Sequence, residues 1–231
     1  MCGRYTLTTD IQSISARFVA PLSETYAEIA KEFSSPSFNI APATYRPVVI
    51  NKENKNVLTF MKWGLIPVWA KDEKIGYKMI NARAESLAEK PSFKRSLQKQ
   101  RCIIPATGFY EWKKEGNLKQ PYYFKLKNEN IFGFAGLYEK WTNEKGKDIY
   151  TYTIITVKPN DLVKIVHDRM PAILTKNNEN SWLNSSKTSV EEQLNLLNTY
   201  SCKEMEFYPV SKNINSPTNN NDSLIKPINS I

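Results

Sequence analysis

The chain has 231 residues, of which 41% are hydrophobic and 24% charged, a composition typical of a folded domain rather than a disordered chain. Its longest apolar runs, such as Ile131–Leu137, are far shorter than the roughly 20 residues needed to cross a bilayer, and no apolar leader follows Arg4. These features exclude a membrane protein and indicate a cytoplasmic one, and the net charge of +9 favours a polyanionic partner such as nucleic acid.

The first half of the chain is predicted to alternate short helices and strands. After a strand at 3–8, apolar residues recur at helical spacing, and Thr9 and Gln12 have the spacing of a capping box. The remaining elements of this half are a helix at 24–33, strands at 46–51 and 57–66 joined by a polar turn, a helical or irregular segment at 81–89, and a helix opened by Pro91.

The second half is strand-rich. Turns at Gly116-Asn117 and 143–146 indicate antiparallel hairpins. The predicted elements are strands at 102–113, 121–127, 132–141 and 150–157, helices at 160–168 and 190–197, and a last strand at 206–210. We therefore expect one α+β domain over residues 1–231, with a curved, barrel-like, mostly antiparallel sheet and flanking helices. The polar segment 212–231 is predicted to dock on the body through Leu224, Ile225 and Pro227.

The cysteine and histidine content argues against a metal site. Cys2, Cys102 and Cys202 lie 100 residues apart, so no closely spaced metal-binding pair exists, and His167 is the only histidine. An odd number of cysteines without a secretion signal also argues against a disulfide framework. We expect neither a metal nor a cofactor.

Cys2 carries the most specific chemistry. If Met1 is removed, Cys2 has an α-amine and a thiol on adjacent carbons. The amine condenses with an aldehyde to an imine, and the thiol then closes a thiazolidine ring. A terminal amine has a pKa of about 7.7–8.0, so part of it is nucleophilic at neutral pH. The alternative is that Cys2 is merely a small residue beside the start.

Three further segments carry polar groups that suit catalysis. Asn81, Arg83 and Glu85 would share one face if extended, where Arg83 could hold a phosphate; the alternative is a solvated face. Glu111 lies between aromatic residues, a setting that raises a carboxyl pKa; the alternative is an outward-facing strand residue. His167 is the only imidazole available for acid–base chemistry, or else a packing residue at a helix end.

Other residues could contact nucleic acid through stacking or charge. Trp63 and Trp69 flank a short turn-forming stretch and would suit stacking on unpaired bases, although core packing is the alternative. The basic run from Lys94 to Arg101 could follow a phosphate backbone, or form a solvated helix face.

Taken together, six ordered segments resemble the SRAP (SOS response-associated peptidase) family of abasic-site processing proteins. They are Cys2–Tyr5, Asn39–Pro42, Trp63–Pro67, Asn81–Glu85, Pro105–Trp112 and His167–Pro171. The segments 210–211 and 224–227 also fit the end of its pattern, so the resemblance covers nearly the whole chain, whereas residues 18–37 and 219–221 depart from it.

The resemblance implies a function and roles for individual residues. Family members lose Met1, bind single-stranded DNA or junctions and attach the terminal cysteine to an abasic site. Carried over, Cys2 forms the crosslink, Asn81 orients it, and Glu111 and His167 move protons. The residues implied to contact DNA are Arg4, Arg83, Trp69, Trp63 and Pro42.

The alternatives from the residues are a thiol peptidase acting in trans and a non-covalent single-strand binder. Autoproteolytic loss of Met1 and a weak lyase side reaction are compatible with the crosslinking hypothesis, which expects a monomer acting on single-stranded DNA.

Overall fold

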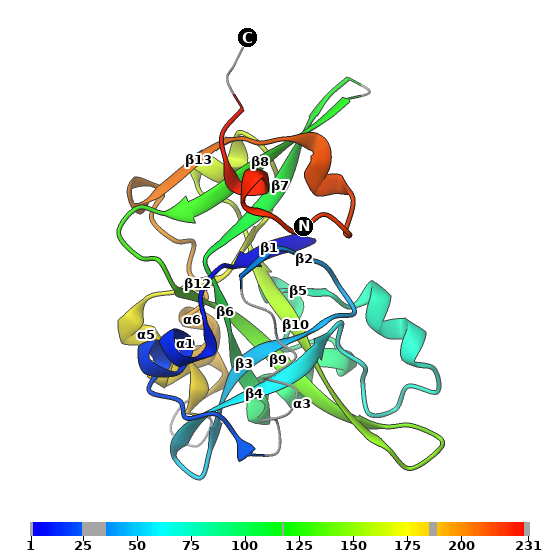
Figure 1. The fold of residues 1–231 in the computed structure, drawn as a ribbon. Coiled ribbons are helices and arrows are strands. Elements are labelled where there is room, and N and C mark those ends of the chain that lie inside the picture. The colour runs from blue at the N-terminus through cyan, green and yellow to red at the C-terminus, as the bar shows by residue number, and fades with distance from the viewer. Residues whose placement is uncertain (1, 25–35, 117, 185–188, 229–231) are drawn as a thin grey trace.

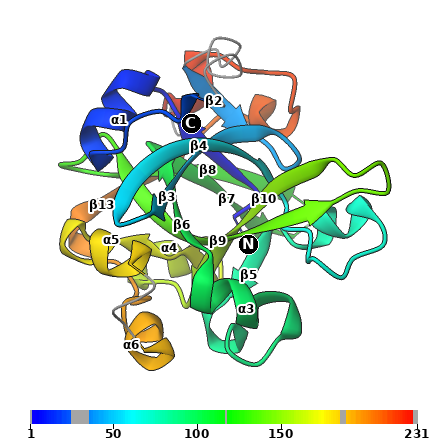
Figure 2. The ribbon, with the colours of Figure 1, turned by 90° about the horizontal axis from the view of Figure 1, so that it is seen from below.

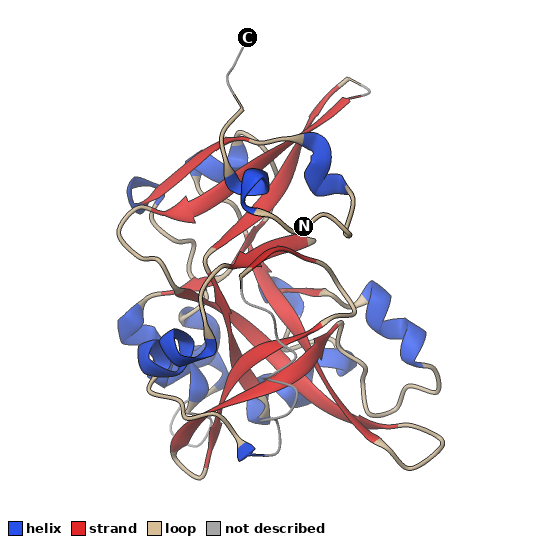
Figure 3. Ribbon diagram, viewed as in Figure 1, coloured by secondary structure: helices blue, strands red, loops and turns tan. Residues whose placement is uncertain are grey.

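Two β-sheets, one above the other in Figure 1, form the body of the protein. The structure is a computed structural model that describes residues 2–24, 36–116, 118–184 and 189–228. Helices lie outside the strands (Figure 3), so the α+β prediction is confirmed.

The lower sheet closes on itself as a five-stranded barrel, visible end-on in Figure 2. Its strands, in ring order, are β10 (Asp148–Val157), β4 (Lys55–Trp63), β3 (Tyr45–Lys52), β6 (Arg101–Ala106) and β9 (Phe132–Thr142). The ring closes because β9 and β10 also pair. Most pairs are antiparallel, but β10 runs parallel to β4 and to the short β5 (Asn81–Arg83). Two short strands extend the sheet: β11 (Met170–Pro171) beside β10 and β12 (Ile173–Leu174) beside β9.

The upper sheet includes the N-terminal strand, which has a partner strand on each side. Its order is β13 (Met205–Pro209), β8 (Leu118–Leu126), β7 (Gly108–Glu115), β1 (Arg4–Leu7) and β2 (Ser37–Ile40). The prediction of a single strand over 102–113 is wrong. The chain breaks at Thr107, where it passes from β6 of the barrel to β7 of the upper sheet, and the Thr107 N–H there donates to the carbonyl of Thr6 at 2.8 Å.

The helices are short, and three of the five α-helices in the described part of the chain begin at a side-chain cap, namely Asp10, Asn160 and Ser189. The α-helices are α1 (Ile11–Phe18), α3 (Pro91–Lys99), α4 (Asp161–Lys164), α5 (Lys176–Leu183) and α6 (Val190–Asn195). Asp10, rather than Thr9, caps α1, because its carboxylate accepts from the backbone N–H of Ser13 at 2.7 Å. The 3-10 turns are Glu73–Lys78, Ala84–Ser86, Cys202–Glu204, Lys212–Asn215 and Asp222–Ile225.

Several other expectations differ from the structure. The predicted helix at 24–33 lies almost entirely outside the described residues, and α5 and β2 were not predicted. In the described ranges, no helix is long and apolar enough to cross a membrane.

An aromatic cluster ties β1 to the barrel. The hydroxyls of Tyr5 and Tyr152 lie 2.9 Å apart and are buried. Trp63 stacks on Tyr152 with ring centroids 6.3 Å apart and meets Tyr5 edge-on at 5.3 Å. Trp63 is only 1% exposed, and its indole N–H donates to the carbonyl of Ile80. The expectation that Trp63 stacks on DNA bases is therefore wrong, because its ring is enclosed in the core.

A glycine ends β4 three residues earlier than predicted. Gly64 has φ +118°, and a Cβ at that position would lie 2.6 Å from the carbonyl oxygen of Gly76. Only glycine accommodates both constraints, so the strand stops at Trp63 and the chain turns away.

The C-terminal segment packs on the upper sheet. Ile214 and Leu224 are buried with Tyr110, Tyr123 and Val210 in a small second core. We call residues 211–228 the C-terminal strap; it lies beside the N-terminal strand in Figure 1. Buried Asn39, in β2, joins it to the sheet: its amide donates to the carbonyls of three strap residues, Ile214, Ser216 and Asn219, at 2.9–3.3 Å.

We expect Asn39→Ala to destabilise the protein. The substitution leaves three strap carbonyls and a guanidinium N–H of Arg4, which Asn39 accepts at 2.6 Å, without that partner. The free energy of unfolding should fall by about 2–4 kcal/mol in urea denaturation. The matched control is Asn213→Ala, because the Asn213 side chain is exposed. Equal stability of the two variants would contradict this role of Asn39.

Candidate active site

Two strand registers bring the predicted catalytic residues together. In the upper sheet, Arg4 pairs with Tyr110 in antiparallel register. Residues before Arg4 therefore run toward residues after Tyr110, which carries Cys2 toward Glu111. The two groups are close enough that the Glu111 charge raises the pKa of the Cys2 thiol.

Strand β10 positions the two segments that carry the other predicted catalytic residues, Asn81 and His167. It pairs in parallel with β5, with Ile154 opposite Asn81, and in antiparallel with β11, with Val157 opposite Met170. His167 lies three residues before Met170, so one strand positions both Asn81 and His167 at the edge of the barrel that faces the upper sheet.

Asn81 holds the backbone of Cys2. Its side-chain N–H donates to the Cys2 carbonyl at 2.8 Å. The other end of the amide, Oδ1, is buried and accepts no hydrogen bond from any described residue. A buried amide oxygen without a donor is unusual, and here it lies beside the residue whose amine the proposed chemistry needs.

Glu111 and His167 form an acid–base pair with opposite pKa shifts. Nε2 of His167 lies 3.8 Å from a carboxylate oxygen of Glu111, which is 2% exposed. Burial raises the pKa of Glu111 to about 7. Burial also lowers the pKa of half-buried His167 below its usual 6.5. Burial therefore shifts both groups toward their neutral forms.

The backbone sets the tautomer of His167. The N–H of Arg169 donates to Nδ1 at 3.0 Å, so in the neutral ring the proton is on Nε2, the nitrogen that faces Glu111. A carboxylate oxygen of Asp168 also lies 2.9 Å from Nδ1, but this carboxylate is largely solvent-exposed. Its attraction acts mainly on a protonated ring, which the lowered pKa disfavours.

The Cys2 thiol is kept neutral. The residue is completely buried, and burial, followed by the charge of Glu111, raises the pKa of its thiol well above the usual range. The Sγ atom lies 3.6 Å from the carbonyl oxygen of Arg4.

A cavity of about 700 Å³ opens beside these residues. It is lined by Arg4, Glu111, Trp112, Lys114, Lys119, Val166, His167, Asp168 and Asn215. Arg4 donates to the Asn39 side chain at 2.6 Å and to the carbonyl of Ile214 at 3.0 Å, both neutral acceptors. Asn39, Trp112 and the strap residue Asn215 were not predicted as site residues. The only sequence signal for Asn39 and Trp112 was that each lies within a recognised segment, and Asn215 had none.

The remaining residues singled out from the sequence are either exposed or bonded elsewhere in the structure. Arg83 and Trp69 are exposed, Trp69 by 57%, and Pro42 is partly exposed. Glu85 does not share a face with Asn81 and Arg83, because the chain turns after Arg83. Its carboxylate instead binds the guanidinium of Arg169 through two hydrogen bonds, at 2.7 and 2.9 Å. Across the described ranges, no group of three or more His, Cys, Asp or Glu side chains could hold a metal ion.

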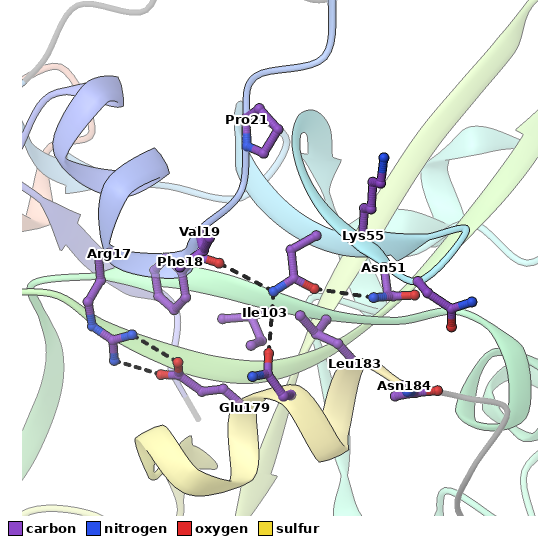
Figure 4. A pocket seen from close by; sticks show the side chains of 13 residues that line it. Arg17, Phe18, Val19, Pro21, Asn51, Lys55, Ile103, Glu179, Leu183 and Asn184 are labelled. Carbon is purple, nitrogen blue, oxygen red and sulfur yellow. Dashed lines mark hydrogen bonds and ion pairs between the residues drawn. The ribbon is translucent and has the colours of Figure 1, made fainter.

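A second cavity, of about 620 Å³, lies elsewhere and contains none of these residues (Figure 4). On one side of it, Arg17 and Glu179 form two hydrogen bonds, at 2.7 and 2.9 Å. The Asn56 side chain bridges Phe18 and Asn180 at 3.3–3.4 Å. The charged and amide groups that line this second cavity therefore bond chiefly within the protein.

Comparison with known proteins decides the family. The sequence profile named "SOS response associated peptidase (SRAP)" matches residues 1–217. The chain belongs to the SRAP family. The SRAP chain is 49% identical over 231 residues to "Abasic site processing protein YoqW" of Bacillus subtilis, covering 98% of this chain and 99% of that protein.

Two more distant proteins are also similar to this chain, one in sequence and one in fold. The chain is 32% identical over 225 residues to "Abasic site processing protein HMCES" of Gallus gallus, covering 84% of this chain and 66% of that protein. A crystal structure of a protein from Bacteroides thetaiotaomicron superposes with a TM-score of 0.90 at 30% identity, covering 98% of this SRAP chain and all of that one. The predicted SRAP membership and fold are confirmed.

We expect Glu111→Gln to change how the stability of this SRAP protein depends on pH. The folded pKa of Glu111, about 7, is above its ordinary value of 4.5, so the native state holds the proton more tightly. This contribution to stability is complete below about pH 4.5 and is lost as pH rises through about 7. The wild type should therefore lose up to about 3 kcal/mol relative to the variant between pH 5 and 8. Parallel stability curves in urea denaturation would contradict the shifted pKa.

Proposed function

We propose that this protein processes abasic sites in DNA by forming a covalent thiazolidine link from Cys2, once Met1 is removed. The observation that carries the proposal is the clamped Cys2 backbone, with its Asn81 hydrogen bond at 2.8 Å, beside a carboxyl of pKa about 7. The SRAP relatives, named as abasic site processing proteins, support the substrate class. The link would shield the lesion during the DNA damage response. The protein would act in the cytoplasm, bound to DNA.

The chemistry proceeds in two bond-forming steps. Hydrolysis of the Met1–Cys2 peptide bond frees the α-amine. The amine nitrogen attacks the aldehyde carbon of the ring-opened abasic sugar, and the resulting carbinolamine loses water to form an imine. The Cys2 sulfur then adds to the imine carbon and its proton passes to the nitrogen, which closes the thiazolidine ring.

The protonation state of the Cys2 thiol favours this order of steps. Because burial keeps the Cys2 thiol protonated, the amine is the better first nucleophile. The thiol needs to lose its proton only when the imine is already in place, when ring closure is intramolecular.

The surrounding residues suit proton transfer. Glu111, with a pKa near 7, would take a proton from the attacking amine and return it to the departing hydroxyl. Neutral His167 would donate a hydrogen bond from Nε2–H on the same side and so orient the Glu111 carboxyl group during these transfers. The unpaired Oδ1 of Asn81 would accept from the freed amine and aim its lone pair at the aldehyde.

The DNA strand would be held by charge and by exposed rings. Arg4 lines the cavity and Arg83 is exposed at the end of β5, where each would contact a phosphate flanking the lesion. Trp69 and Pro42 are accessible for contacts with bases at a single strand or junction. We propose that the protein acts as a monomer, without a metal.

The two alternative functions, a thiol peptidase and a non-covalent binder, require different properties of Cys2. A thiol peptidase acting in trans needs a thiolate nucleophile, whereas burial raises the pKa of Cys2. Autocatalytic removal of Met1 and weak β-elimination from the imine remain compatible with the proposal. A purely non-covalent binder would not need the Asn81–Cys2 clamp.

We expect wild-type protein lacking Met1 to form a stable adduct with an abasic oligonucleotide. The substrate is a uracil-containing single strand treated with uracil glycosylase, and the adduct is scored as a shifted band on a denaturing gel. Cys2→Ala should form none. A variant that retains Met1, verified by intact mass, should form none either, because its α-amine is an amide. An equal adduct from Cys2→Ala would overturn the proposal.

We expect Asn81→Ala to slow adduct formation about 10- to 100-fold under saturating protein, because the Cys2 backbone loses its clamp. DNA affinity, measured with an abasic analogue that has no aldehyde, should be nearly unchanged. Asn81→Asp keeps an acceptor oxygen and should retain more activity than Asn81→Ala. If both variants react at the wild-type rate, Asn81 does not position Cys2.

A further inference from the structure

Two lysines face each other across the β7–β8 hairpin beside the candidate active site. Lys114 and Lys119 are directly paired in the antiparallel register, and both are exposed. Like charges at directly opposed positions destabilise a two-stranded ladder. A pair of this kind is stabilised when an anion binds between the ammonium groups.

Among the described side chains, none neutralises the pair. No carboxylate with a described side chain forms an ion pair with either Lys114 or Lys119. By contrast, Lys125 on β8 binds Glu206 at 2.9 Å and Lys140 on β9 binds Asp148 at 3.0 Å, each on its own sheet. The lysine pair therefore presents two positive charges for an outside ligand.

The pair belongs to the same cavity as the proposed catalytic groups. Both lysines line the cavity that contains Glu111 and His167. Lys114 is three residues beyond Glu111 on β7, about 10 Å along an extended strand, so its side chain points to the opposite face of the sheet from Glu111. The pair therefore lies outside the bond-forming site, in the part of the cavity that is also lined by Trp112, two residues before Lys114.

The charge balance of the cavity favours an anion. Arg4 is held by neutral oxygens of Asn39 and the strap, so its positive charge is not cancelled there. Glu111 is largely buried, and burial favours its neutral form. Asp168, the other acidic residue that lines the cavity, carries one negative charge against the three positive charges of Arg4 and the lysines.

We propose that Lys114 and Lys119 form a phosphate-binding subsite for the DNA backbone flanking the abasic residue. The β7–β8 hairpin thus holds the strand beyond the lesion, while Arg4 holds it near Cys2. The identity of the ligand as DNA rests on the proposed function.

The test measures non-covalent binding with a single-stranded oligonucleotide that carries a tetrahydrofuran abasic analogue, which has no aldehyde. The variant Lys114→Gln/Lys119→Gln removes both charges, and Lys145→Gln/Lys147→Gln, in the β9–β10 turn, removes two charges elsewhere. Fluorescence anisotropy is followed over a range of salt concentrations. The first variant should bind about tenfold more weakly at low salt. Its plot of log K against log salt should also be less steep, with a slope smaller in magnitude by about 1. The control variant should keep the wild-type slope.

A second measurement locates the phosphate. Replacing one phosphate at a time by an uncharged methylphosphonate should weaken wild-type binding most at one flanking position. The lysine variant should be insensitive to that replacement. A lysine variant with wild-type slope and wild-type sensitivity at every position would overturn the subsite.

Adduct formation separates this inference from the proposed function. At protein concentrations below saturation, the lysine variant should form the adduct more slowly than wild type, because it binds the strand more weakly. Absence of the adduct from wild type, with the lysine-dependent salt slope intact, would overturn the proposed chemistry and leave the subsite supported.

Discussion

The site depends on how firmly the N-terminal strand is anchored. A terminal strand tends to fray, but β1 lies between two partner strands, and its Tyr5 hydroxyl meets that of Tyr152 at 2.9 Å inside the core. Thr6 and Thr107 fix the strand again through backbone and hydroxyl contacts of 2.8–2.9 Å. These contacts, completed by Asn81, hold Cys2 at a defined place, so a freed amine would start in a defined geometry rather than on a mobile end.

Burial is the main electrostatic influence on the site. The same desolvation raises the pKa of Glu111 to about 7 and lowers the pKa of His167, because burial disfavours the charged form of each group. The pKa of Glu111 thereby comes to lie above that of His167, the reverse of their ordinary order. A carboxyl group with a pKa near neutrality can both release and take up a proton, which suits a reaction whose steps alternately release and consume one.

The charge of Arg4 is preserved by the choice of its partners. Its acceptors are the amide oxygen of Asn39 and backbone carbonyls of the C-terminal strap, which orient the guanidinium without an opposing charge. An aspartate in place of Asn39 would hold the side chain equally well but cancel its attraction for phosphate. A segment with the composition of a polar tail thus forms part of the wall of the site, and Asn215 of the strap also accepts from the indole of Trp112 at 2.8 Å.

The sequence by itself determined the family, the barrel-like α+β fold, most strands and helices, and the candidates Cys2, Asn81, Glu111 and His167, because local periodicity and ordered motifs are written in the chain. It could not decide between core and surface for Trp63, since both settings suit an indole. It also could not show the break at Thr107, the Glu85–Arg169 pair or the opposed lysines. Those depend on strand register and on contacts between residues far apart in the chain, which only the tertiary structure sets.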